Sequence, residues 1–484
     1  MAAPYEHVLL VSVDGLHALD LANRAATHPE GTLARLAKAG VTYRQAMAPL
    51  ISDSFPGFAA QVTGGGPGTT GVYYDDSYDR ALFPPGSDCN GEAGTEVPFA
   101  SEIDVEPSQA DAGGTIGQPM TQIEPKKLPL RKTADGCVPV YPHDYLRTNT
   151  AFEVVHAHGG RTAWSDKHPA YEWLAGPSGQ GLDELYAVEQ DALIPGTKVR
   201  TTGSFAAERD FDQRRVAALL NMMRGMDGAG TAKVSVPALF GMNSQAVSVG
   251  QKLPKAGPGD APGLKGGYAD AAGQPNDGLA EQLDYVDGAL GQLLSGLKDN
   301  GLDGSTLVIV SAKHGQSPID PQAYRPTDDK PLDAVLGHAF HVADDGVLLW
   351  LKPSERTARL PDALAALERD RKALGIGAIL PPAAVASLFA DPATDSRAPD
   401  IMVGTDPGVV FTSGKKAAEH GGMGFDDRNV ALVVAGPGVK PAAVAGPVGT
   451  AQIAPTILKA LGYAPEELRA VKAEGTPALP GLPF

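Results

Sequence analysis

Polar side chains stand at or shortly after the ends of three apolar runs that have the length and composition of buried strands. These groups are Asp14 after residues 7–13, Asn243 after residues 233–240, and Lys313 with His314 after residues 307–311. Ligands of open α/β sheets bind at the carboxyl ends of the strands, so we expect the four side chains to meet in one site. Singly, Asp14 could cap a helix and His314 could be a hydrogen-bonded core histidine. Three strand ends that carry polar groups favour a functional site over both simpler interpretations.

A serine stands just before an expected helix start. Ser54 precedes residues 58–62, which are expected to be helical and lie before the run Gly64-Gly65-Gly66. A helix N-terminus offers free N–H groups and the positive end of the helix dipole, which favour a serine alkoxide and a neighbouring oxyanion. From the pattern alone, however, an N-cap is the simpler interpretation of this serine. The glycine run lacks a following Lys-Ser or Lys-Thr, so it is not a nucleotide-binding P-loop.

The elements that must position these groups alternate between strands and helices. Further strands are expected at residues 347–351 and 430–435, and helices at residues 33–39, 148–160, 205–223, 277–298, 360–374, 383–389 and 453–461. Nearly continuous apolar strands are typical of a parallel sheet that is covered on both faces. The pattern therefore predicts an α/β fold with a mostly parallel central sheet and helices on both sides.

Two segments interrupt this alternation. Residues 80–147 are rich in Gly, Pro, Ser and Asp without periodicity, which predicts an insertion or lid. Residues 318–414 mix short strands with helices, which predicts a smaller lobe on a single domain of residues 1–484. Cys89 and Cys137 both fall in the first segment. They could form one disulfide, as suits an exported protein, or remain two unrelated thiols.

Composition narrows the classes of partner. The chain has 484 residues, with 40 Lys and Arg against 57 Asp and Glu, so its net charge is −17. Such a surface repels a polyphosphate backbone, which argues against stable nucleic-acid binding but allows a small anionic substrate in a locally positive pocket. No apolar run reaches the ~18 residues of a membrane span, so none is expected. The missing signal peptide fits a cytoplasmic protein, or a secreted or periplasmic one whose signal was removed.

The order of several short motifs resembles that of a known family. The motifs are Val13-Asp14-Gly15, Ser54-Phe55-Pro56, Val62-Thr63-Gly64, Pro67, Gly71, Tyr78-Asp79, Ser311-Ala-Lys-His-Gly315 and Glu419-His420-Gly421. Together they are similar to the nucleotide pyrophosphatases/phosphodiesterases (type I phosphodiesterases) of the alkaline phosphatase superfamily. The resemblance implies an alkaline-phosphatase-like fold, two metal ions, usually zinc, and a Thr or Ser nucleophile that forms a covalent phosphoryl intermediate.

Carried over by position, the resemblance assigns a role to each motif residue. It implies that Ser54 is the nucleophile, that Asp14, Ser54 and His314 surround one metal ion, and that His420 ligates a second or protonates the leaving group. Asp75 corresponds to an Asn that holds a phosphate oxygen in the family, and we also expect Asn243 to contact substrate. A divalent cation would lower the hydroxyl pKa enough for a serine to attack at neutral pH. Besides zinc, calcium, magnesium or manganese could fill this role.

The chain departs from the family at the expected metal site. Lys313 stands where the family has a metal-binding Asp, and Asn243, Gln245 and Gln251 stand where it has an Asp and a His. An ammonium group has no lone pair and cannot ligate a metal, and amide oxygens are weak ligands for zinc.

Three hypotheses follow from this departure. The first is a metal-assisted hydrolase of phosphodiesters, or of related phosphoryl or sulfuryl esters. In it Asp14 and His314, with Asp75 or Asp53, hold one metal, and Lys313 binds the transferring group. The second is a metal-independent phosphoryl or sulfuryl transferase, and the third is a non-catalytic relative that binds a ligand. Because Ser54 and the motif residues around it remain, we favour the first.

A polar and aromatic cluster and a pair of histidines are two further candidates for a function. In the segment 164–172, Asp166 or His168 could contact the leaving group, although a self-satisfied structural loop is the simpler interpretation. His338 and His341 lie three residues apart without a third ligand at standard spacing, so we expect them to be structural or surface residues.

Overall fold

A computed structural model of the chain describes residues 3–337, 339–412 and 414–484. His338, for which a structural or surface role was predicted, therefore lies outside the described residues. None of the helices within these ranges is both long enough and apolar enough to cross a membrane.

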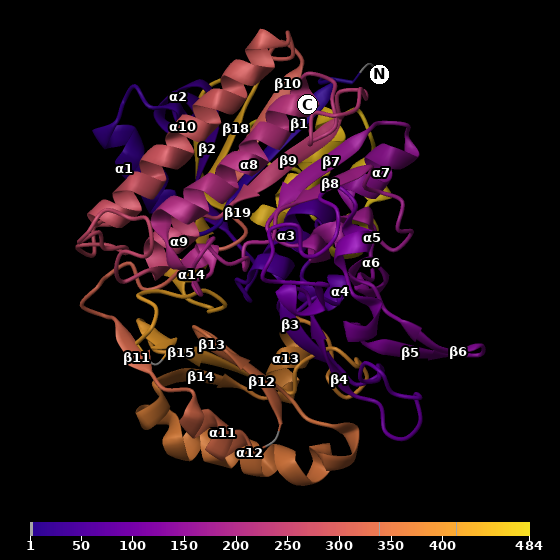
Figure 1. Cartoon of the computed structure of the whole chain (residues 1–484). Helices are drawn as coiled ribbons and strands as arrows, with labels where there is room; N and C mark the ends of the chain where they lie inside the picture. Colours follow the sequence, from indigo (N-terminus) through magenta and orange to yellow (C-terminus); the bar gives the residue numbers. More distant parts are fainter. Residues whose placement is uncertain (1–2, 338, 413) are drawn as a thin grey trace.

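A nine-stranded mixed sheet forms the centre of the molecule (Figure 1). Its parallel part contains, in spatial order, β10 (Thr306–Ser311), β1 (His7–Val13), β9 (Leu239–Ser244), β7 (Thr162–Asp166) and β8 (Glu184–Ala187). Beyond β10, the sheet continues with β18 (Leu432–Ala435), β2 (Val41–Met47), β17 (Asn429–Val430) and β19 (Ala442–Gly449). β18 pairs antiparallel with β10, and β2 with β18. The predicted mostly parallel sheet is confirmed.

Helices cover both faces of this sheet (Figure 1). One group packs together and consists of α8 (Phe205–Met223), α9 (Ala246–Lys252), α10 (Asp277–Asp299), α1 (Ala18–Thr27) and α2 (Thr32–Ala39). The other group contains α3 (Ser54–Thr63), α7 (Ala151–Ala157), α15 (Ile453–Ala460) and α16 (Arg469–Glu474). β1, β9 and β10 are buried almost throughout, because apolar helix faces press on both of their sides.

One strand lies further along the chain than predicted. The strand expected at residues 233–240 is instead β9, Leu239–Ser244, and it begins just after Pro237. Its last four residues are Gly-Met-Asn-Ser, which lack the continuous apolar character on which the prediction relied. Asn243 therefore lies within the buried end of β9 and not beyond it.

Smaller sheets carry the remaining segments. The two-stranded sheets β3–β4 (Asp76–Asp79, Thr95–Pro98) and β5–β6 (Leu130–Thr133, Gly136–Pro139) lie within residues 76–139, and Cys89 and Cys137 form a disulfide there. A four-stranded antiparallel sheet orders β12 (Phe340–Ala343), β13 (Gly346–Trp350), β15 (Ile401–Thr405) and β14 (Ile376–Leu380), and α11 (Lys330–Leu336), α12 (Pro353–Leu374) and α13 (Pro382–Leu388) lie beside it. We keep the division into a core, an insertion at 80–147 and a lobe at 318–414 as a proposal.

α3 packs closely on the end of β10 at Gly57, so a methyl group added there should destabilise the protein. A Cβ added at Gly57 would lie 2.2 Å from the carbonyl oxygen of Lys313, at the end of β10. Gly57→Ala should push α3 off the strand end and lower the free energy of unfolding by about 1–3 kcal/mol, measured by urea denaturation.

A matched control is Gly288→Ala in α10, where an added Cβ would meet nothing within 4 Å. Replacing this helical glycine should raise stability by about 0.5–1 kcal/mol. If Gly57→Ala unfolds at the same urea concentration as the unaltered protein, the close contact between α3 and Lys313 is wrong.

Candidate active site

Four neighbouring parallel strands end at the same edge of the sheet. In the strand register, Ser12 of β1 lies beside Asn243 of β9 and Ser311 of β10, and Ser165 of β7 lies beside Met242. The chain therefore turns out of the sheet at one level. The polar groups delivered there are Asp14, Asp166, Lys167, Asn243, Gln245, Lys313 and His314, and all of them are buried. The predicted convergence of strand ends is what the structure has.

Ser54 is the first residue of α3 and faces this edge. The carboxylate of Asp53 accepts the backbone N–H of Phe55 at 3.0 Å, so Asp53 is the N-cap and the Ser54 hydroxyl is free for other contacts. Its Oγ lies 3.0 Å from Lys167 Nζ and 3.2 Å from His314 Nε2. A hydroxyl at the positive end of a helix, beside an ammonium and an imidazole, is in the environment of a nucleophile.

His314 presents a lone pair to Ser54. Its Nδ1 lies 2.8 Å from the carbonyl oxygen of Gly315, and a carbonyl can only accept, so Nδ1 carries the hydrogen and Nε2 does not. Burial outweighs the attraction of Asp14 and lowers the pKa of His314 to about 4. The imidazole is therefore neutral at pH 7, and its Nε2 can accept the Ser54 proton.

The Asp14 carboxylate accepts hydrogen bonds from several side chains of the site. Asn243 Nδ2 donates to one of its oxygens at 2.9 Å, and Gln245 Nε2 and Lys167 Nζ donate to the other at 2.5 and 3.2 Å. Burial alone would raise the pKa of Asp14, but the ammonium groups of Lys313 and Lys167 outweigh it and hold the pKa far below its ordinary value. Asp14 is thus a permanent buried charge.

The two lysines divide their roles in a way that the sequence did not indicate. Lys313 Nζ is fully buried, donates to the Tyr171 hydroxyl at 2.8 Å and lies 3.4 Å from Asp166. It does not line the pocket in front of Ser54, so the predicted contact between Lys313 and the transferring group is corrected. Lys167 lines that pocket instead, and the attraction of Asp14 and Asp166, which exceeds the effect of burial, raises its pKa.

The sequence pattern indicates the neighbours Asp166 and His168 but not Lys167. Its position directly after β7 could have indicated it, because Asp14 and His314 are identified by the same kind of position after a strand. His168 also lines the pocket, with its Nδ1 2.8 Å from the buried carboxylate of Glu189.

A pocket of about 330 Å³ opens in front of Ser54. His420 and Asp75 line it. The ring of His420 lies 4.0 Å from that of His314 between centroids, and its Nδ1 is 3.5 Å from Asp53. Burial and the charge of Asp53 raise the pKa of Asp75, and a protonated carboxyl there would donate a hydrogen bond, as an Asn would.

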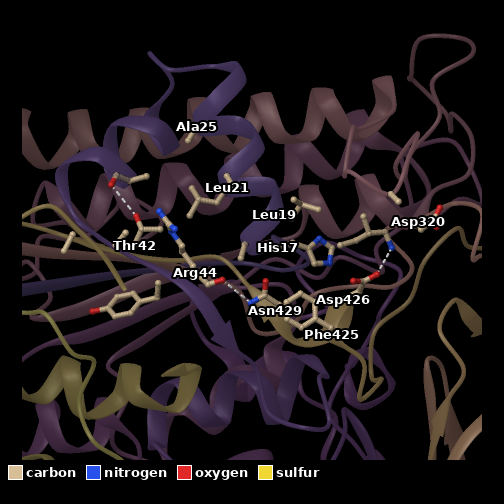
Figure 2. A pocket seen from close by; sticks show the side chains of 18 of the residues that line it. His17, Leu19, Leu21, Ala25, Thr42, Arg44, Asp320, Phe425, Asp426 and Asn429 are labelled. Atoms are coloured by element: carbon tan, nitrogen blue, oxygen red, sulfur yellow. Dashed lines mark hydrogen bonds between the residues drawn. The ribbon is translucent and has the colours of Figure 1, made fainter. Parts of the chain in front are cut away.

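A larger cavity, of about 900 Å³, lies elsewhere, against α1, β2 and β19 (Figure 2). Its lining is mostly apolar and includes Leu19, Leu21 and the exposed Phe425. Neither Ser54 nor any of the strand-end groups around it belongs to this lining, so we place the site in the smaller pocket.

The donor set does not fit the expected one or two metal ions. Lys167 Nζ stands within 3.2 Å of Asp14 and 3.0 Å of Ser54, and a metal at this position would face its positive charge. Asn243 and Gln245 point N–H groups, not oxygens, at Asp14. Among the residues that the structure describes, no three His, Cys, Asp or Glu side chains are arranged to hold a metal ion.

Comparisons with known proteins agree with this fold. A family model, "Type I phosphodiesterase / nucleotide pyrophosphatase", matches residues 8–426. No curated protein matches the sequence. Murine ectonucleotide pyrophosphatase / phosphodiesterase 5 is similar at 15% identity and a TM-score of 0.56, with 95% of both chains covered. An inactive variant of it in complex with AMP gives 15%, 0.55 and the same coverage.

The alkaline phosphatase PafA is similar at 13% identity and a TM-score of 0.60, and 95% of this chain and 96% of that one are covered. At these identities the likeness concerns the fold, which is alkaline-phosphatase-like. The family model, in contrast, covers most of the sequence and therefore shows which family the chain belongs to. The chain belongs to the type I phosphodiesterase / nucleotide pyrophosphatase family, whose members are hydrolases.

Proposed function

We propose that the chain hydrolyses a phosphodiester, or another singly charged ester, through a covalent intermediate on Ser54. The observation that carries this proposal is the position of the Ser54 hydroxyl. It stands at the start of α3, 3.2 Å from a neutral imidazole nitrogen of His314, and lines a pocket with room for a small ester.

The reaction would take place in two displacements. In the first, Ser54 Oγ bonds to phosphorus, the bond to the leaving alkoxide breaks, and the hydroxyl proton passes to a base. In the second, water attacks the phosphoryl-serine, Ser54 Oγ leaves and regains its proton, and the phosphoryl product departs.

The inner charges of the site favour a singly charged substrate. Two ammonium groups, on Lys167 and Lys313, face two carboxylates, on Asp14 and Asp166, within 4.0 Å. Their formal charges cancel, which leaves little surplus positive charge for a dianion. A protonated Asp75 would donate a hydrogen bond to the phosphoryl oxygen without adding charge.

The comparisons support nucleotide-derived diesters as the first substrates to test, because a structure of the murine relative contains AMP. The zinc-dependent form of the reaction that the resemblance implied is not supported by the donor set around Asp14. Sulfate monoesters, which also carry one negative charge, remain in the same substrate class.

Replacement of the nucleophile gives the first functional prediction. Ser54→Ala removes the oxygen on which the proposed intermediate forms, so turnover of bis(p-nitrophenyl) phosphate should fall at least about 1000-fold. Mass spectrometry of the acid-quenched, unaltered protein should find a p-nitrophenyl phosphoryl group on the peptide that contains Ser54.

The matched control is Ser52→Ala, two residues away, because the Ser52 hydroxyl donates to the Gly422 carbonyl at 2.9 Å and does not line the pocket. It should keep activity within a few-fold. A Ser54→Ala protein that retains full turnover would refute the nucleophile.

Substrate charge gives a second prediction. With one leaving group, kcat/KM for bis(p-nitrophenyl) phosphate should exceed that for the dianion p-nitrophenyl phosphate by about tenfold or more, because Asp14 and Asp166 already balance the ammonium groups of Lys167 and Lys313 beside Ser54. p-Nitrophenyl sulfate serves as the singly charged comparison. Faster turnover of the phosphate monoester would contradict the charge argument.

A further inference from the structure

The side chains around Asp14 and Ser54 do not suit a metal ion, and this has a chemical consequence. We infer that Lys167 and His314 replace the metal ion of the family, so that the Ser54 reaction of this chain needs no divalent cation. Lys167 supplies the positive charge and His314 takes the serine proton. The inference rests on the proposed function for its chemistry, but the zinc-binding arm of its test does not.

The ammonium of Lys167 is surrounded by groups that would otherwise face a cation. Its Nζ lies 3.0 Å from Ser54 Oγ, 3.2 Å from Asp14 Oδ2 and 3.4 Å from Gln245 Oε1. One formal positive charge therefore already stands between the nucleophile and the Asp14 carboxylate. A second cation there would meet repulsion from the first at a few ångströms inside a buried site.

The end of β7 fixes this ammonium in place. The Lys167 backbone N–H donates to the Asp166 carboxylate at 2.8 Å, and Trp164 Nε1 donates to the same carboxylate at 2.6 Å. Lys313 faces that carboxylate from the other side at 3.4 Å. The lysine that replaces a metal-binding carboxylate in the family thus holds Asp166, and Asp166 positions Lys167.

The amides around Asp14 complete the replacement. Gln245 Nε2 donates both to Asp14 and, at 2.5 Å, to Asn243 Oδ1, while Asn243 Nδ2 donates to Asp14. Both Asp14 oxygens are occupied by N–H donors. A metal ion that bound Asp14 through Oδ2 would have to displace the Gln245 and Lys167 donors.

His314 is thereby available as a base. In the family arrangement its ring nitrogen would point at a metal ion, whereas here Nε2 carries a lone pair 3.2 Å from the Ser54 hydroxyl. A neighbouring base and an ammonium together activate a serine in the same sense as a bound cation does.

The proton balance closes without a metal. As Ser54 Oγ bonds to phosphorus and the alkoxide leaves, the hydroxyl proton moves to His314 Nε2. When water attacks the phosphoryl-serine, the imidazolium returns its proton to Ser54 Oγ. The proton of the attacking water goes to solvent, which also protonates the released alkoxide.

The test has an arm that measures binding and an arm that measures turnover. Full-length protein is dialysed against a chelator, its zinc content is measured, and zinc is titrated into it by calorimetry. We expect no zinc binding at about 100 μM to the unaltered protein. The double variant Lys167→Ala, Lys313→Asp, which vacates the ammonium position and restores a carboxylate, should bind zinc.

Zinc binding by the unaltered protein that Asp14→Asn abolishes would overturn the inference, whether or not any ester is hydrolysed. If the double variant does not fold, the zinc titration of the unaltered protein still decides. Failure of the proposed function would appear separately, as absence of turnover in a protein that binds no zinc.

The turnover arm uses bis(p-nitrophenyl) phosphate with chelator present throughout. The unaltered protein should keep its rate, and Lys167→Met should lose about 100- to 1000-fold, while the exposed charge control Lys298→Met does not. His314→Ala should lose a comparable factor and recover part of it when imidazole is added, which a merely structural histidine would not do. Loss of the unaltered rate on chelation, with recovery on added zinc, would overturn the inference.

Discussion

The buried carboxylate of Asp14, where β1, β9 and β10 end, determines which groups the rest of the site must contain. Asp14 cannot remain charged there unless its environment supplies hydrogen-bond donors and opposite charge. Lys167 provides the charge, at 3.2 Å, and the amides of Asn243 and Gln245 provide the donors. In relatives that use metals, a cation meets the same need. In our proposal, the presence of an ammonium in place of a metal ion leaves His314 free to act as the base for Ser54.

The fold places the groups that balance the charge of Asp14 within hydrogen-bonding distance of it. Four parallel strands bring their ends to one level, and α3 approaches so closely that Gly57 packs on the Lys313 backbone. Ser54, at the start of α3, is thereby held against His314 and Lys167. The same closeness keeps most of the charged groups out of water, which strengthens every interaction among them.

Much of this arrangement was predictable from local sequence, since long apolar runs and amphipathic repeats specify buried strands and helices. β1 and α8 begin and end where the patterns predicted. Ser54, Asp14, His314 and His420 could be placed because short motifs carry their identity. β9 was placed too early because its functional half is polar, and its burial depends on neighbouring strands that lie far away in the sequence.

The roles of the two lysines could not be predicted in the same way. A lysine side chain is long, and which carboxylate it reaches depends on the lateral order of strands, which no local pattern encodes. Lys313 follows β10, yet its ammonium crosses to Asp166 at the end of β7, and Lys167 crosses from β7 to Asp14 at the end of β1. Only the sheet order, with β9 between β1 and β7, reveals this exchange.

The most direct test of the central claim is anomalous diffraction at the zinc absorption edge, from crystals of the unaltered protein grown or soaked with zinc. Our account predicts continuous density for the Lys167 side chain beside Ser54 and no anomalous peak next to Asp14. A peak at coordination distance from Asp14 and His314, with the Lys167 ammonium displaced, would contradict it.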